Sequence, residues 1–140
     1  MNKKEGGKEI LKIILDSNAL FVPLQFKIDI FDDLKRLLNV NFEVVLLSPI
    51  RKELEKLVNE GSPKIRKHAS YALKLAEKCK LVEVNEETAY SPDDIIAKIA
   101  KEWNSPVFTN DTQLRRRLRN INVPVIYVRQ KSRLEIDGRL

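Results

Sequence analysis

Acidic residues at four places in the sequence are the side chains best suited to carry out a reaction. Asp16 and Asp111 each follow an apolar run, whereas Glu53 and Asp93 lie near the start of a predicted helix. If these carboxylates converge, each pair ~4 Å apart costs about 4 kcal/mol at an effective dielectric of ~20. Such a cluster is stable only if some members are protonated or a divalent cation lies among them. The second case predicts a hydrolase that depends on Mg²⁺ or Mn²⁺.

Each acid also has an ordinary structural explanation. The Asp-Ser-Asn sequence at 16–18 is typical of a turn, and Glu53 could complement the dipole of a helix that has Ser48 as its N-cap. The Thr-Asn-Asp sequence at 109–111 lies at a strand-to-helix junction, where Asn110 is expected to be the N-cap. The hypothesis of a catalytic site therefore depends on the acids occurring together.

Asp93 and Asp94 follow a Ser-Pro pair at a predicted helix start, and either could point toward the other acids. Asp93 shares a helix face with Ala97 and Ala100, whose small side chains would let the helix pack close to the sheet. We therefore predict Asp93 as the inward ligand and Asp94 as a capping or supporting acid. The neighbours or alternative ligands expected at the site are Asn18, Asp94 and Thr109.

The elements that position these acids follow from the hydrophobic pattern. Short apolar runs predict β-strands, and apolar residues at helical spacing predict helices between them. This alternation predicts a parallel five-stranded sheet with helices on both faces, a three-layer α/β/α sandwich. With the strand order 3-2-1-4-5, Asp16 and Asp111 follow the two strands that flank the switch point, where ligands bind. The predicted strands are 10–15, 43–47, 81–84, 106–109 and 124–128, and the predicted helices are 28–38, 48–59, 62–79, 91–103 and one beginning after Asn110.

Length and composition limit the classes of protein. The 140 residues are expected to form a single domain over 1–140, with a lead-in at 1–9 and a polar tail at 129–140. A single cysteine cannot form an internal disulfide, and no apolar run approaches the ~20 residues of a membrane span, so we expect a cytoplasmic protein without membrane contact. One histidine and four glycines leave little basis for a zinc site, a Ser-His-Asp triad or a phosphate-binding loop.

The net charge of +6 and the pI of about 9.5 favour a polyanionic partner, although a soluble surface can also be basic. Four arginines follow Asp111 within five positions, so they cannot all share one helix face. Those that face the mouth of the site would bind RNA phosphates, and the others would be solvated. Tyr127 and Phe108 are expected to be core residues. The candidate RNA-binding residues are Arg115, Arg116, Arg117 and Arg119.

At these residues the chain resembles the PIN-domain nucleases. Four segments match the acidic pattern of that family in order and spacing, over about residues 10–130: Ile-Ile-Leu-Asp-Ser-Asn ending at 18, Ser-Pro-Ile-Arg-Lys-Glu-Leu around 53, Asp-Asp-Ile-Ile-Ala from 93, and Thr-Asn-Asp at 109–111. The resemblance implies a Mg²⁺- or Mn²⁺-dependent endoribonuclease with a three-layer α/β/α fold, often a homodimer. The catalytic and metal-binding residues that it implies are Asp16, Glu53, Asp93 and Asp111.

The C-terminal half is most similar to the PIN proteins that cleave pre-rRNA, and the chain also resembles small archaeal PIN proteins and VapC-type toxins. These relatives imply RNA as substrate, with a ribosome-assembly partner or an antitoxin. The pre-rRNA nucleases carry additional cysteine-bearing segments that this sequence lacks. Two further alternatives are an RNA-binding PIN module without catalysis and a phosphatase with Asp16 as nucleophile. The phosphatase is disfavoured because Asn18 stands where a second acid is needed.

Overall fold

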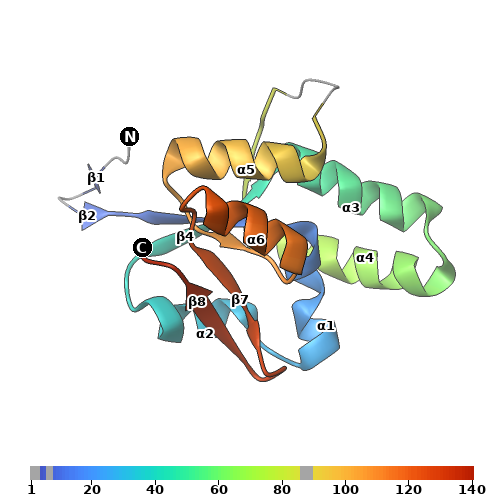
Figure 1. Cartoon of the computed structure of the whole chain (residues 1–140). Coiled ribbons are helices and arrows are strands. Elements are labelled where there is room, and N and C mark those ends of the chain that lie inside the picture. The colour runs from blue at the N-terminus through green and yellow to red at the C-terminus, as the bar shows by residue number, and fades with distance from the viewer. Residues whose placement is uncertain (1–3, 6–7, 86–89) are drawn as a thin grey trace.

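A six-stranded sheet forms the centre of the structure, a computed structural model that describes residues 4–5, 8–85 and 90–140 (Figure 1). The strand order is β5-β4-β3-β6-β7-β8, with β8 antiparallel to β7 and the other neighbours parallel. The predicted order 3-2-1-4-5 is confirmed, with a sixth strand added at the edge. The strands of this sheet are β3 (Leu11–Leu15), β4 (Phe42–Leu47), β5 (Lys80–Val82), β6 (Val107–Phe108), β7 (Val125–Arg129) and β8 (Arg133–Asp137).

Helices cover both faces of this sheet, as the alternating pattern predicted. Helix α2 lies on one side and α5 and α6 lie on the other, while the α3–α4 pair projects past the sheet (Figure 1). None of the helices among the described residues is long and apolar enough to cross a bilayer. The helices are η1 (Ser17–Phe21, a 3-10 helix), α1 (Val22–Phe26), α2 (Ile30–Leu38), α3 (Ser48–Glu60), α4 (Pro63–Ala76), α5 (Pro92–Trp103) and α6 (Thr112–Asn120).

The central strand β3 is an apolar run because it is covered on both faces. Ile13, Ile14 and Leu15 are fully buried, as is Phe108 on the neighbouring strand β6. The chain then turns directly into η1 and α1, where the sequence predicted only a turn. The lead-in predicted at 1–9 is described only at the short antiparallel pair β1 (Lys4–Glu5) and β2 (Lys8–Glu9), and its remaining residues lie outside the described part of the chain.

The segment predicted as a polar tail, residues 129–140, is not a simple tail, because residues 133–137 form strand β8. This strand pairs with β7 along its whole length and buries Leu134. The turn between the two strands holds Gln130 and Lys131 at φ values of 53° and 59°. Hairpin turns with positive φ usually contain glycine or asparagine, so this turn carries no recognisable sequence signal. The absence of that signal explains why the hairpin was not predicted.

Ser48 was predicted to be the N-cap of α3, but the cap is Leu47 and Ser48 is the first helical residue. The Ser48 side chain is buried, and its Oγ accepts a hydrogen bond of 2.9 Å from the backbone N–H of Val84. This bond ties the segment that leaves β5 to the start of α3. It therefore fixes the direction in which the chain runs toward α5.

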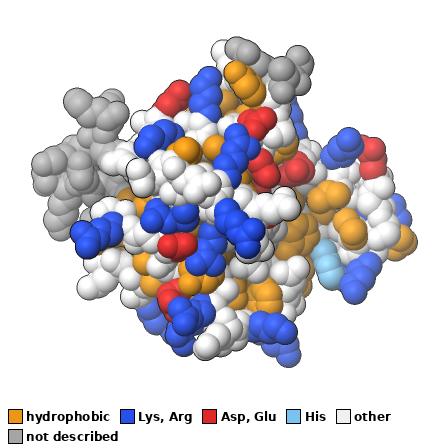
Figure 2. All heavy atoms as spheres, viewed as in Figure 1, with side chains coloured by type: hydrophobic (Ala, Val, Ile, Leu, Met, Phe, Trp, Pro, Cys, Tyr) orange, Lys and Arg blue, Asp and Glu red, His pale blue; other side chains and the backbone are white. Residues whose placement is uncertain are grey.

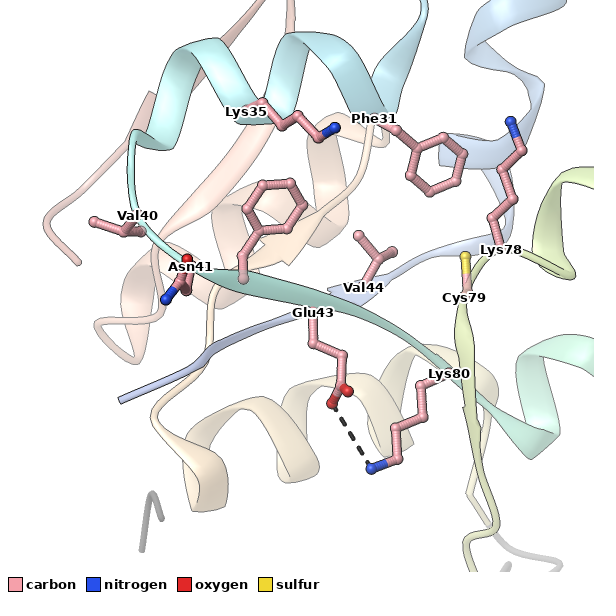
Figure 3. Close-up of a pocket in the computed structure, with 10 residues that line it drawn as sticks. Phe31, Lys35, Val40, Asn41, Glu43, Val44, Lys78, Cys79 and Lys80 are labelled. Atoms are coloured by element: carbon pink, nitrogen blue, oxygen red, sulfur yellow. Dashed lines mark ion pairs between the residues drawn. The ribbon is translucent and has the colours of Figure 1, made fainter. Parts of the chain in front are cut away.

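A hollow of about 670 Å³ lies at the amino-terminal half of β4, away from the carboxyl ends of the strands (Figure 3). Phe31, Lys35 and Lys78 lie along one side of it, and Glu43 pairs with Lys80 at 3.8 Å. Cys79 lines the same hollow as a free thiol. Burial raises the pKa of this thiol to about 12, so it is unreactive at neutral pH.

Replacing Ser48 with alanine is expected to lower the free energy of unfolding by about 1–2 kcal/mol, because the Val84 N–H loses its acceptor. Urea denaturation measures this change. Ser70→Ala on the exposed face of α4 is the matched control and should change stability by less than about 0.5 kcal/mol. Equal stability of the two variants would mean that the Ser48 bond contributes nothing.

Candidate active site

The carboxyl ends of β3 and β6 lie side by side, and each delivers one polar residue to the same place. Asp16 follows β3 and Thr109 follows β6. The Asp16 N–H donates to the carbonyl of Phe108 at 3.0 Å, so the two strand ends are held in register beyond the last paired residues. Asp16 is 5% exposed and Thr109 is fully buried. A carboxyl group is therefore held almost out of water at the switch point of the sheet.

Thr109 orients the Asp16 carboxyl group. Its Oγ1 donates to Asp16 Oδ2 at 2.7 Å and accepts from the backbone N–H of Asp111 at 3.1 Å. Asp16 Oδ1 accepts from the N–H of Ser17 at 2.8 Å. Both oxygens of Asp16 are thus fixed by donors, one of them the hydroxyl of Thr109.

Asn18 joins the same network from η1. Its Oδ1 accepts from the backbone N–H of Asn110 at 2.9 Å and lies 3.4 Å from Thr109 Oγ1. Asn18 therefore holds the turn after β6 against the turn after β3. Asn18 therefore supports the turn that contains Asp16. A supporting neighbour is one of the two roles expected from the sequence, and a ligand is the other.

The pKa of Asp16 is raised to about 6 from an ordinary value of 3.8. Burial is the largest cause, and the nearby carboxylates of Asp93 and Glu53 add to it, while the hydrogen bonds from Thr109 and Ser17 oppose it. Acids of α5 and α3 therefore act electrostatically on Asp16.

Asp93 and Asp94 take different roles at the start of α5. Burial raises the pKa of Asp93, with a further contribution from Asp111. Asp94 instead completes a capping box with Ser91 and forms an ion pair of 2.7 Å with Arg117, which holds the pKa of Asp94 below its usual range. Asp94 is therefore the capping acid, and Asp93 is the acid of the pair on which Asp111 acts.

The helix after β6 begins differently from the prediction. Its N-cap is Asp111, whose Oδ1 accepts from the N–H groups of Gln113 and Leu114, and not Asn110. The side chain of Asn110 accepts a hydrogen bond from the N–H of Val128 on β7. Asp111 thus has one carboxylate oxygen committed to the start of the helix.

The donors gathered here are those that a hard divalent cation prefers, because every one is an oxygen. Among the described residues, no three His, Cys, Asp or Glu side chains stand close enough to ligate one ion directly. Mg²⁺ usually keeps several waters and contacts only one or two carboxylates, so it does not need three direct side-chain ligands. The donor set fits such a cation through a hydrated shell. Figure 2 shows acidic side chains grouped on the face where α5 begins, with Lys and Arg around them.

The comparison with known proteins agrees with this geometry. A family model described as a PIN like domain matches residues 13–131. This chain belongs to the PIN-domain family. Ribonuclease VapC4 of Methanocaldococcus jannaschii is 40% identical to this PIN domain over 128 residues, which cover 91% of this chain and 97% of that protein. Ribonuclease VapC9 of Archaeoglobus fulgidus is 27% identical over 124 residues, with 89% and 87% covered.

Solved structures share the fold of this PIN domain. The PIN domain endonuclease Utp24 matches it with a TM-score of 0.75 at 26% identity, over 92% of each chain. VapBC2 from Rickettsia felis bound to a DNA fragment matches with a TM-score of 0.63 at 16% identity, over 85% of this chain and 100% of that chain, which shows the fold alone. The resemblance read from the four acidic segments and the α/β/α architecture are both confirmed.

The four arginines of α6 in this PIN domain have different surroundings. Arg115 and Arg119 both pair with Asp137 of β8, at 3.0 and 3.2 Å. Arg117 pairs with Asp94 on the opposite side of the helix. Arg116 is exposed and has no ion pair with the described residues. Sequence reasoning missed Asp137 because it lies in the segment that was predicted to be a tail.

Asp16→Asn is expected to stabilise this PIN domain at pH 7 in EDTA by about 1–3 kcal/mol. The Asp16 pKa is about 6 when folded and 3.8 ordinarily, so the buried carboxylate costs roughly 3 kcal/mol above pH 6. This cost is absent below pH 3.8 and grows as pH rises from there to about 6. Asparagine removes the charge, and the Thr109 hydroxyl can turn to Asn18 Oδ1, 3.4 Å away.

Urea denaturation of the wild type and of Asp16→Asn at pH 4 and pH 7 measures the difference between their free energies of unfolding. The advantage of the variant should shrink toward pH 4, where the wild-type carboxyl is protonated. Asp32→Asn on the exposed face of α2 is the matched control and should show no such pH-dependent gain. A destabilised Asp16→Asn at pH 7 would show that the Asp16 charge is not costly.

Proposed function

We propose that this PIN domain is a divalent-metal-dependent endoribonuclease that hydrolyses RNA phosphodiester bonds with an activated water. The observation that carries the proposal is the nearly buried Asp16 carboxyl, which Thr109 orients and whose pKa is raised by burial and, to a smaller extent, by Asp93 and Glu53. Burying a carboxylate in this way raises its pKa, and residues with strongly shifted pKa values cluster at functional sites. The proposed catalytic and metal-binding residues are Asp16, Glu53, Asp93 and Asp111.

Several features support Mg²⁺ or Mn²⁺ as the cation. The proposed ligands are carboxylates, and neither the histidine on α4 nor the buried thiol of Cys79 belongs to the site. Oxygen donors suit hard cations better than zinc. A cation bound here supplies activation of the attacking water and neutralisation of the charge that develops on the phosphate.

The residues of the chain perform the remaining tasks. Thr109 and Ser17 hold the Asp16 oxygens in fixed directions, so the anchoring carboxylate loses little freedom when the site is filled. Asp93 is less buried than Asp16, and its raised pKa suits it to accept a proton from the attacking water. Asn18 and Asn110 hold the two turns together and so maintain the spacing between Asp16 and Asp111.

The relatives bear on the biological role. The 40% identity to Ribonuclease VapC4 extends over nearly the full length of both chains, which favours a VapC-type ribonuclease held by an antitoxin. The match to the Utp24 endonuclease supports the same chemistry and leaves rRNA processing with an assembly partner as the second candidate. A homodimer and a cytoplasmic location remain predictions. The sequence keeps all four acids, which disfavours a PIN module without catalysis.

Asp16→Asn is expected to abolish Mn²⁺-dependent cleavage of single-stranded RNA, by more than about 100-fold, because the anchoring carboxylate is lost. Gel analysis of a labelled oligonucleotide measures the rate. Asp32→Asn, on the exposed face of α2, is the matched control and should cleave at the wild-type rate. Undiminished cleavage by pure Asp16→Asn would remove Asp16 from the mechanism.

Millimolar Mg²⁺ or Mn²⁺ is expected to raise the melting temperature of the wild type, because a bound cation relieves the repulsion among the acids. At a ~100-fold excess over the dissociation constant, binding stabilises the fold by about 3 kcal/mol. Thermal melting in EDTA and in metal measures the shift, which should be much smaller for Asp16→Asn. Identical wild-type melting in both buffers would argue against a cation site.

A further inference from the structure

A groove of two adjoining hollows starts at Asp111 and follows one side of α6. The first hollow, of about 430 Å³, lies between Asp111 and the β7–β8 hairpin. The second, of about 420 Å³, lies farther along α6 and ends at Asp137. Thr112 and Arg115 line both hollows, so the Arg115 side chain forms the wall that they share.

Arg115 is held in place from two directions. Its guanidinium lies over the ring of Tyr127, 3.6 Å from the ring centroid. Its Nε donates to Asp137 Oδ2 at 3.0 Å. The side chain nevertheless remains 31% exposed. A planar cation that is fixed and still accessible can stack on a nucleobase, because guanidinium planes bind the π-faces of bases.

We propose that this groove binds two successive nucleotides of a single RNA strand, with Arg115 stacking on a base next to the bond that is cut. This inference rests on the proposed ribonuclease function. The nine residues of α6 extend about 13 Å, which is close to the length of two nucleotides of an extended strand. The volume of each hollow is sufficient for one base with its sugar.

The charges along the groove suit a phosphate backbone. Arg116 and Arg119 line the second hollow and Arg129 lines the first. Asp137 is shared by Arg115 and Arg119, and Glu135 is shared by Arg129 and Arg133, so arginines outnumber acids here. Figure 2 shows Lys and Arg side chains spread over the face formed by α6, β7 and β8. An RNA strand that leaves the acidic site along this face would meet an excess of positive charge.

The other side of α6 packs against α5. Arg117 points to that side, where it pairs with Asp94 at 2.7 Å. A hollow of about 500 Å³ there is lined by Asp94, Lys98, Lys101 and Arg117 together with apolar residues. The structure therefore separates the four arginines of α6 into a strand-binding side and a side that is used to hold α5.

Arg115→Lys tests the proposal, because lysine keeps the charge but lacks the planar group. Both proteins carry Asp16→Asn, so that RNA stays intact in Mn²⁺. Fluorescence anisotropy compares a five-nucleotide oligoadenylate with an abasic strand of the same length and charge. The parent protein should prefer the oligoadenylate by about tenfold, a typical value for one stacked base. Arg115→Lys should reduce this preference to about two- to threefold and change affinity for the abasic strand little.

Arg66→Lys on the exposed face of α4 is the matched control and should keep the full preference for bases. Thermal melting of each variant verifies the fold. Equal base preference in Arg115→Lys and its parent, or no preference in the parent, would overturn the role of Arg115. Absence of cleavage by the wild type in Mg²⁺ and Mn²⁺ would instead refute the ribonuclease function, so the two failures are distinguishable.

Discussion

The hydrogen bond between Thr109 and Asp16 is the interaction on which the rest of the site depends. It joins residues 93 positions apart and links the carboxyl ends of β3 and β6, the two strands at the switch point. The same hydroxyl accepts from the N–H of Asp111, so one side chain positions the acid after β3 and the turn that leads into α6. Because Thr109 is fully buried, water does not compete for these bonds, and the geometry survives the repulsion among the acids.

That repulsion is a cost that the surrounding fold offsets. Asp16 follows three fully buried apolar residues of β3, and Leu20 in the helix after it is also fully buried. Burial of such side chains contributes about 1.5–3 kcal/mol each, which is comparable to the roughly 3 kcal/mol that the raised pKa of Asp16 represents. A handful of core residues is therefore sufficient to hold one costly carboxylate in place.

The sequence singled out Asp16 and Asp111 because they follow apolar runs, which mark strand ends, and Glu53 and Asp93 because they lie near predicted helix starts. It also predicted a helix start at Ser91 with Asp94 as a capping acid, and the structure shows Asp94 in a capping box with Ser91. It did not predict which polar residue caps a helix when several are adjacent: Asp111 replaced Asn110 because Asn110 binds the N–H of Val128 on β7. Ser48 was misplaced for the same reason, since its hydroxyl binds Val84. In both cases the side chain binds a backbone N–H that is distant in the sequence and does not cap its own helix. Residue spacing near the helix start does not reveal such a bond.

Helix α6 connects the acids to the basic groove through its own periodicity. Asp111 caps the helix, and Arg115 lies one turn later, with its N–H bound to the carbonyl of Asp111. An arginine so close to an acid would ordinarily neutralise it. Here Asp137 and Tyr127 draw the Arg115 guanidinium toward β7 and β8, so Asp111 keeps its charge for the acidic site. Strand β8, which the sequence did not predict, thus holds the Arg115 guanidinium away from the Asp111 carboxylate. Without Asp137, Arg115 would be free to pair with Asp111.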